Sequence, residues 1–189
     1  LILVSASHLV SHMQFGSTSV LFPVMMRDLN FGYLQLGVLS AVSHFTGQGL
    51  QIIYGFLSGV IKRTVILGTA QVMLGTAVIL HGLVGSYAQL LVTRIFSGLG
   101  SSPQHPVGSS ILSTSFAKTR AWALTVHHTA GNLGSFVAPA VAAVLLLYMG
   151  WRPIFLIFWS LSLLMGLVYF LLRDRVVIPA ESKDKKEIA

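Results

Sequence analysis

Histidines inside apolar stretches are the residues of this sequence best suited to chemistry. His8 and His12 are four positions apart, so they lie on one face of a helix. His105 and His128 lie in later apolar stretches. Because histidine changes charge near neutral pH, a group of histidines can carry protons or bind an anionic or polar solute.

A structural role is the alternative for each of these histidines. In an apolar helix, a histidine can simply hydrogen-bond a neighbouring helix. His8 and His12 also have the spacing of metal ligands. However, the chain has no cysteine, and no acidic residue lies within the apolar stretches. We therefore expect no metal site and no other cofactor.

Arg94 is the only basic residue well inside an apolar stretch. A charge in that position is costly unless it faces protein or water. Two roles are equally open. Arg94 could contact an anionic solute or a gate, or it could form a structural hydrogen bond to helix ends or backbone carbonyls.

The apolar stretches indicate a membrane protein. Apolar residue types make up 54% of the 189 residues, and charged types make up 9%, whereas ordinary soluble domains have about 25% charged residues. A helix that spans a membrane needs about 20 mostly apolar residues. Six segments reach this length, so the sequence predicts an all-α bundle of six transmembrane helices in residues 1–172. The segments are 1–26, 33–57, 64–84, 87–116, 121–149 and 153–172.

Basic residues between the segments set the predicted orientation. The side that follows the second, fourth and sixth segments is rich in lysine and arginine, whereas the other side has only Arg27 and Arg152. The positive-inside rule places the basic side and both termini in the cytoplasm, with the bundle in the plasma (inner) membrane. The net charge of +7 thus reflects orientation and does not indicate a nucleic-acid partner. Residues 173–189 are expected to form a polar cytoplasmic tail.

Polar residues are unevenly distributed among the six segments. The first, second, fourth and fifth segments carry them, while the third and sixth are mostly apolar. A helix that faces a polar cavity carries polar residues on one side. We therefore expect these four segments to surround a cavity, and we prefer His128 to the adjacent His127. The predicted solute-binding or cavity residues are His8, His12, His44, Arg94, Gln104, His105, His128 and Asn132.

Several motifs resemble those of the major facilitator superfamily, and most of all its fosmidomycin-resistance group. The best matches are Ser7-His8-Leu9, Gly98-Leu99-Gly100-Ser101-Ser102 running to His105-Pro106, and Gly131-Asn132-Leu133-Gly134 with Pro139. The His-Pro pair is fairly specific to that group. Arg94 followed by Gly98 resembles a general pattern of the superfamily, and so does Gly150-Trp151-Arg152.

This resemblance implies the N-terminal half of a twelve-helix fold. Each six-helix half of that fold consists of two three-helix inverted repeats. The resemblance also implies alternating access, often with proton-driven export of small molecules. The expected partners are a small-molecule solute, protons as a further candidate, the lipid bilayer, and either a C-terminal half or a second copy of this chain. Residues 173–189 would then begin the central loop.

The predicted gating loop after the second segment matches the superfamily only in part. The usual pattern is Gly-x-Leu-x-Asp-Arg-x-Gly-Arg, and Gly55, Leu57 and Arg63 match it. Other residues replace the Asp, Arg and Gly, namely Gly59, Val60 and Lys62. The carboxylates that often serve proton coupling are missing too. Coupling through histidine and uncoupled facilitated transport therefore both stay open.

The predicted function is secondary active transport of small molecules, of the drug or metabolite efflux type, such as an antiporter. One alternative is a non-transporting receptor or scaffold bundle, which would pack its histidines tightly and contain no cavity. The other is a membrane enzyme. We do not expect an enzyme, because the chain has no GxSxG motif, no phosphate loop and no carboxylate pair in the apolar segments.

Overall fold

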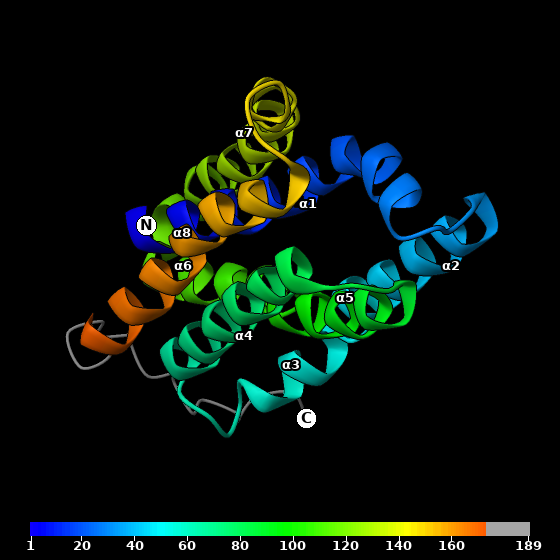
Figure 1. The fold of residues 1–189 in the computed structure, drawn as a ribbon. Helices are drawn as coiled ribbons and strands as arrows, with labels where there is room; N and C mark the ends of the chain where they lie inside the picture. Colours follow the sequence, from blue (N-terminus) through cyan, green and yellow to red (C-terminus); the bar gives the residue numbers. More distant parts are fainter. Residues whose placement is uncertain (173–189) are drawn as a thin grey trace.

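Helices make up nearly all of this computed structural model, which describes residues 1–172 (Figure 1). No β-strand occurs in that range. The predicted polar tail, residues 173–189, lies outside the described residues. The long helices are α1 (Ile2–Asp28), α4 (Arg63–Leu83), α7 (Arg120–Leu146) and α8 (Trp151–Leu172). The shorter helices are α2 (Tyr33–His44), α3 (Gln51–Leu57), α5 (Tyr87–Ser101) and α6 (Ser109–Ser115).

Two of the expected segments are not single α-helices. The segment 33–57 consists of α2, a π-helical turn η1 (Phe45–Gly49), and α3. The segment 87–116 consists of α5, a π-helical turn η2 (Gln104–Gly108), and α6. Pro106 lies within η2 and has no amide proton to donate to the helix. Such wide turns re-aim side chains and are frequent at functional sites.

The number of membrane crossings is only partly supported. Among the described residues, α4, α8 and the stretch 117–146 that contains α7 are long and apolar enough to cross a membrane. Helix α1 has 27 residues, so its polar side chains, and not its length, keep it outside this set. The interrupted segments do not form single helices of the required length. Six crossings stay a prediction.

Close helix contacts depend on glycine. Helix α1 packs along α7, and α4 packs along both α8 and α5 (Figure 1). A Cβ atom at Gly134 of α7 would collide with the backbone carbonyl of Leu9 on α1. A Cβ atom at Gly100 of α5 would collide with the backbone of Leu74 on α4. Small residues at such positions let helix backbones approach in a membrane.

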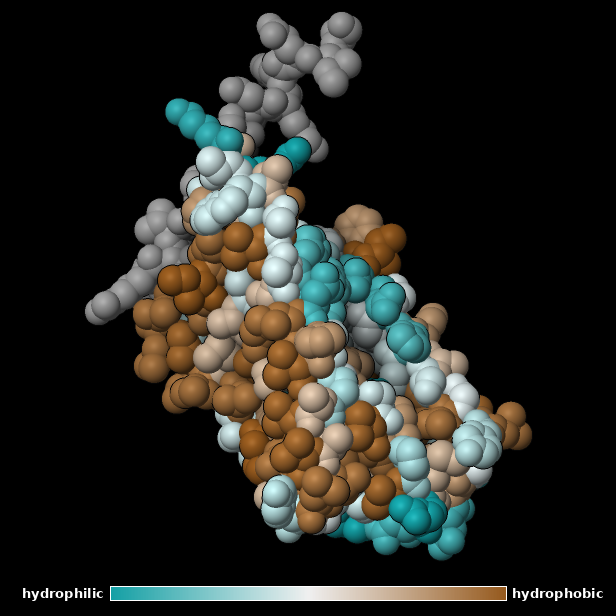
Figure 2. All heavy atoms as spheres, turned by 90° about the horizontal axis from the view of Figure 1, so that it is seen from above, coloured by the Kyte–Doolittle hydropathy of each residue, from teal (hydrophilic) through white to brown (hydrophobic). Residues whose placement is uncertain are grey.

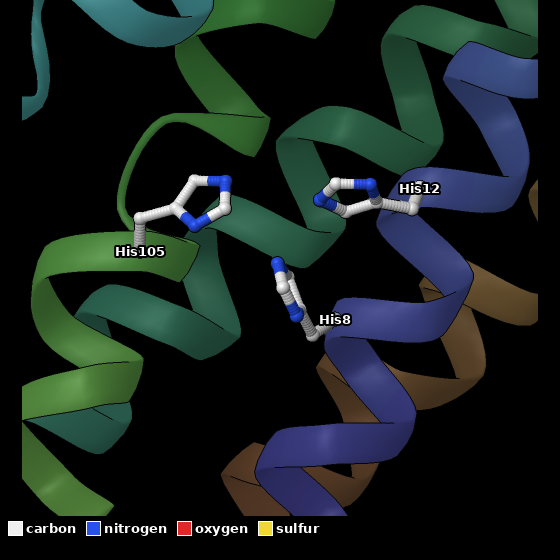
Figure 3. Close-up of side chains that lie close together, drawn as sticks. All are labelled: His8, His12 and His105. Atoms are coloured by element: carbon white, nitrogen blue, oxygen red, sulfur yellow. The ribbon is translucent and has the colours of Figure 1, made fainter. Parts of the chain in front are cut away.

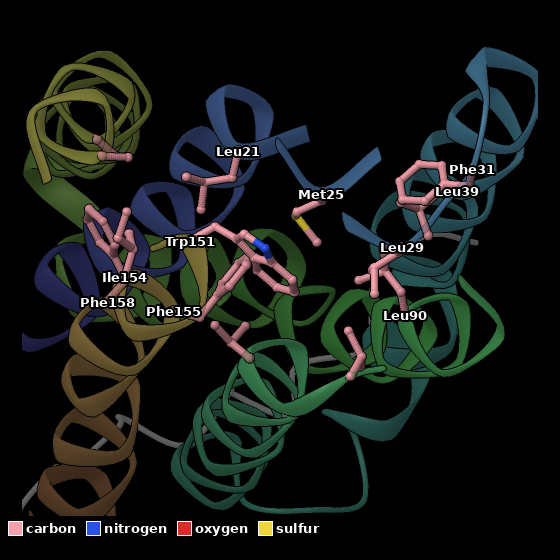
Figure 4. Packing of buried hydrophobic residues seen from close by; sticks show 14 of the residues in the cluster. Leu21, Met25, Leu29, Phe31, Leu39, Leu90, Trp151, Ile154, Phe155 and Phe158 are labelled. Carbon is pink, nitrogen blue, oxygen red and sulfur yellow. The ribbon is translucent and has the colours of Figure 1, made fainter. Parts of the chain in front are cut away.

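The larger apolar cluster holds the C-terminal part of α1 against α4, α5 and α8. Leu21, Met25, Leu90 and Phe155 are almost fully buried in it (Figure 4). On the face drawn in Figure 2, a band of hydrophilic side chains lies between broad hydrophobic areas. Exposed apolar residues such as Phe136 of α7 suit contact with lipid.

Candidate histidine-lined cavity

A cavity of about 180 Å³ lies between α1, the α2–η1 segment and the α5–η2 segment. At about 30 Å³ per water molecule, this volume would hold roughly six waters or one small solute. The lining residues are His8, Ser11, His12, Phe15, Ser43, His44, Gly47, Gln48, Ser101, Gln104 and His105. Three of the four segments expected to surround a cavity therefore contribute to its wall. The fourth, α7, packs against α1.

His8 is the most deeply buried histidine of the cavity wall, with 1% of its surface exposed. Its Nδ1 lies 3.0 Å from the backbone carbonyl oxygen of His127. Because a carbonyl can only accept, Nδ1 donates, and Nε2 of the neutral ring is left with a lone pair. Nε2 is buried and has no hydrogen-bond partner within the described residues. Leaving such an acceptor unpaired costs free energy, so a ligand in the cavity would stabilise it.

Helix α7 positions the His8 ring from behind. The His127 ring stacks on the His8 ring, with centroids 4.0 Å apart and planes inclined by 13°. A Cβ atom at Gly131 would lie 2.6 Å from Cε1 and 2.8 Å from Nδ1 of His8. The ring therefore fits only because residue 131 has no side chain.

His12 and His105 face His8 across a short gap. Their ring centroids lie 4.4 Å and 4.9 Å from that of His8, and 5.7 Å from each other. Figure 3 shows the three rings converging, with His8 and His12 on α1 and His105 on the neighbouring green segment. The spacing of His8 and His12 was visible in the sequence. The approach of His105, 93 residues after His12, depends on the fold.

Gln104 and His44 also lie on the cavity wall. The Gln104 side chain donates through Nε2 to Ser7 Oγ at 3.3 Å, and Ser7 Oγ lies 2.8 Å from the Tyr169 hydroxyl. Gln104 thereby connects η2 to α1 and α8. His44 accepts at Nδ1 from Gln48 Nε2 at 3.4 Å, so this part of the wall also carries paired polar groups.

Arg94 lies behind the wall and does not line the cavity. Its Nε donates to Ser43 Oγ at 3.0 Å, and its guanidinium carbon lies 5.4 Å from the Phe15 ring centroid and 6.0 Å from that of Phe22. Ser43 and Phe15 are themselves lining residues. Arg94 therefore adds positive charge next to the cavity without reaching into it, and its hydrogen bond goes to a hydroxyl and not to backbone carbonyls.

The structure does not bring His128 and Asn132 into the cavity wall. Both are exposed on α7, although the His128 ring is only 6.0 Å from that of His8 and 6.3 Å from that of His105. Their roles in solute contact stay predictions. The buried histidine of the pair is His127, which the sequence interpretation ranked second. It lies on a line of small buried residues that marks the packed face of α7: Ala123, Gly131, Gly134 and Ala138.

The predicted gating residues lie on either side of the turn that connects α3 and α4. Gly55 and Leu57 are in α3, and Leu57 packs against a second apolar cluster that includes Leu67 and Leu112. Arg63 begins α4 and donates through Nη1 to Thr114 Oγ1 of α6 at 3.5 Å. This bond connects two segments that are far apart in the sequence. A gating role for these residues stays a prediction.

Apolar helices, exposed apolar side chains and a small, partly open cavity lined by polar residues together indicate a multi-pass membrane protein. The model of the Major Facilitator Superfamily matches residues 4–188, and the chain belongs to that superfamily. The proteins of this family are transporters and not enzymes, which agrees with the expectation that the chain is not an enzyme.

Individual relatives are distant. The probable sulfoacetate transporter SauU from Cupriavidus necator is 24% identical over 88% of this chain and 39% of its own length. The fosmidomycin resistance protein of Escherichia coli is 23% identical over 76% of this chain and 35% of its own length. It is one of several relatives at similar identity, so membership in its group stays a prediction. The chain spans well under half the length of these relatives.

A solved structure shows the same fold. The bacterial homolog to the human lysosomal transporter Spinster, in an inward-facing and occupied conformation, matches with a TM-score of 0.83 at 17% identity. The match covers 90% of this chain and 43% of that protein. It supports the expected class, an all-α bundle similar to part of a major facilitator superfamily transporter.

Proposed function

We propose that the chain forms the N-terminal half of a secondary transporter that binds a small anion in the histidine-lined cavity and moves it by alternating access. The observation that carries this proposal is the unpaired Nε2 of His8, which faces His12 and His105 across the cavity and would donate to an anion once it is protonated. A non-transporting scaffold would pack these rings tightly without a cavity. The cavity between α1, α2 and α5 does not fit that alternative.

An anionic solute fits the charges around the cavity. None of the lining residues is a carboxylate, while imidazole and hydroxyl groups can donate to an anion and Arg94 lies directly behind the wall. A buried positive charge without a carboxylate near it favours negative charge close by. SauU, named as a sulfoacetate transporter, is a relative whose named solute is an anion.

The proposed topology has six crossings with both termini in the cytoplasm and the bundle in the plasma (inner) membrane. The distribution of lysine and arginine supports it. We also propose that the bundle consists of two inverted three-helix repeats and works with a C-terminal half or a second copy. A match to 43% of a complete transporter fold supports such a partner.

Export is the proposed direction, with proton antiport as the proposed coupling. The relation to a protein named for drug resistance supports export. Right-side-out and inside-out membrane vesicles that contain the intact protein would separate the two directions. Accumulation only in inside-out vesicles, abolished by a proton uncoupler, is the expected result. Accumulation only in right-side-out vesicles would instead show import.

Substitution of the cavity histidines tests the solute site. We expect His12→Ala and His105→Ala each to lower transport of radiolabelled sulfoacetate, or of the small organic anion found active in a panel, by about 10-fold or more. That loss corresponds to roughly 1.4 kcal/mol or more in solute binding. Thr125→Ala is the matched control, since Thr125 is exposed on α7 and bonds only its own helix at Ala121. Unchanged transport in both histidine variants would remove the cavity from the mechanism.

A further inference from the structure

Three histidines from two separate segments meet at one point of the cavity wall. One ring nitrogen from each of His8, His12 and His105 lies within 4.8 Å of the other two (Figure 3). We propose that these residues bind a first-row divalent metal ion, with Zn²⁺ as the best-suited ion and a fourth position open to the cavity. This inference deepens the proposed function, because it names the group that would bind the anion there.

The geometry needs only a small contraction. Ring nitrogens that bind zinc at about 2.0–2.1 Å in a tetrahedral site are roughly 3.3 Å apart. The separations here exceed that value by at most about 1.5 Å, which rotations of the side chains can provide. His8 and His12 are four residues apart on α1, which is the helical spacing that places two imidazoles on one ion. The fold supplies the third imidazole from η2.

Helix α7 holds two of the ligands in the orientation that metal binding requires. Nδ1 of His8 donates to the His127 carbonyl, which leaves the lone pair on Nε2. Nδ1 of His12 lies 2.9 Å from Ser135 Oγ, so the same arrangement is available to His12. In metal sites, the second ring nitrogen of a ligating histidine is almost always bonded in this way. The unpaired, buried Nε2 of His8 is then the atom that faces the ion.

The kind of ligand selects the kind of ion. Imidazole suits zinc, cobalt, nickel and copper, whereas magnesium and calcium prefer carboxylate and carbonyl oxygens. No lining residue of the cavity is a carboxylate or a thiol. A set of three histidines with one open position is also a known form of reactive zinc sites. The sequence prediction of no metal site considered only His8 and His12 and could not include His105.

Charge indicates what the fourth ligand would be. Three neutral imidazoles leave a divalent ion with its full charge, in surroundings where an unpaired charge is costly. Arg94 behind the wall adds to that positive charge. A negatively charged oxygen donor in the cavity would neutralise part of it and complete the coordination. The metal ion would therefore bind the anionic solute directly.

Zinc binding by the purified intact protein tests the site. The protein is prepared in lipid nanodiscs with an affinity tag that contains no histidine, stripped with a chelator, and titrated with Zn²⁺ in a calorimeter. We expect one zinc per chain, and at least about 100-fold weaker binding in His105→Ala. The His105 side chain makes no hydrogen bond within residues 1–172, so we expect His105→Ala to keep the fold. His44→Ala is the matched control, because His44 lies in the same cavity but outside the trio; its zinc affinity should stay within about threefold of the original.

Two further measurements separate the metal site from the transport proposal. Co²⁺ in place of Zn²⁺ should give the visible spectrum of tetrahedral cobalt, and added acetate should shift that spectrum if the fourth position is open. Ser135→Ala should weaken zinc binding by about 10-fold.

Equal zinc binding by wild type and His105→Ala, or no binding at all, would overturn the site. Zinc bound without any solute transport would overturn the proposed function and leave the metal site standing. Transport by chelator-treated, zinc-free protein at the original rate would show that the metal does not bind the solute.

Discussion

The α4–α8 and α1–α7 interfaces use the same kind of close packing for different purposes. At α4–α8, Gly166 lets the backbones approach at Val72, and the cluster around Phe155 fills the neighbouring space with apolar side chains. At α1–α7, glycines also allow the approach, but the ring placed against Gly131 is His8. The α4–α8 interface buries mainly aromatic and aliphatic groups, together with one imidazole, His81, whose Nε2 is unpaired. The α1–α7 interface instead buries the stacked rings of His8 and His127, which together leave three ring nitrogens unpaired.

The comparison shows where stability and binding are separated in this bundle. In a membrane, helices associate through packing and hydrogen bonds, because lipid is as apolar as the helix surfaces. An interface filled with apolar side chains is therefore stabilised by its packing. An interface that leaves polar atoms unpaired gives up some of that stability and keeps groups available for a ligand. Substitutions in the two regions should therefore differ in how much they lower the free energy of unfolding.

The largest expected effect is on the apolar side. Phe155→Ala should lower the free energy of unfolding by about 2–4 kcal/mol, because it leaves a cavity in the packed cluster, while transfer of the ring to lipid offsets part of the loss. Thermal unfolding in detergent measures the effect. Leu156→Ala is the control, since Leu156 is 44% exposed on the same helix. Equal destabilisation by the two substitutions would show that the apolar cluster is not the source of stability.

Closing the gap between α1 and α7 should have the next largest effect. Gly134→Ala places a methyl group against the Leu9 carbonyl, so we expect a loss of about 1–3 kcal/mol from overpacking. Gly37→Ala on α2 is the matched control, because a Cβ atom there has nothing within 4 Å. Thermal unfolding of both variants compares them. A Gly134→Ala protein as stable as Gly37→Ala would mean that α1 and α7 are less closely packed.

Much of the fold could be predicted from the sequence, because membrane helices are marked by length and apolarity. The predicted limits 64–84 and 153–172 lie within two residues of those of α4 and α8. The π-helical turn η1 could not be predicted in this way, since no proline marks it and only glycines at 47 and 49 weaken the helix there. Polar residues such as Gln14 and Ser17 also lower the apolar content of α1, so its crossing stays a prediction.

The site was predictable where its residues share one helix. His8 and His12 could be paired by spacing alone, but the choice between His127 and His128 needed the direction of the packed face of α7. The line of small residues that includes Gly131 was the available signal. The meeting of His105 with His8 could not be derived from spacing, because it depends on how α5 and η2 lie against α1.

A smaller effect concerns the polar contact between α1 and α8. Gln14 donates through Nε2 to Ser162 Oγ and, at 3.4 Å, to the Phe158 carbonyl. We expect a coupling energy of about 0.6 kcal/mol for Gln14 and Ser162, the average for hydrogen bonds between membrane helices, whose largest values reach about 1.7 kcal/mol. A double-mutant cycle with Gln14→Leu and Ser162→Ala measures it by thermal unfolding. Additive effects of the two substitutions would show that α1 and α8 are held by packing alone.

The smallest expected effect lies at the exposed end of α1, beyond its apolar part. The hydrogen bond from Arg152 holds the pKa of Asp28 below its usual value, and a bond from Trp151 at 3.1 Å acts in the same direction. Because the folded-state pKa is lowered, the stabilisation is fully present above the usual aspartate pKa of about 3.9 and is lost as pH falls through the lowered value. The Asp28 and Arg152 side chains are 43% and 42% exposed, so solvent screening keeps the effect small. Asp28→Asn should therefore unfold at nearly the original temperature at pH 7, but its melting temperature should fall less than that of the original protein between pH 5 and pH 3. Arg152→Gln, which removes the main donor, should flatten the same acid response, and an unchanged response in both variants would place the acid-sensitive group elsewhere in the protein.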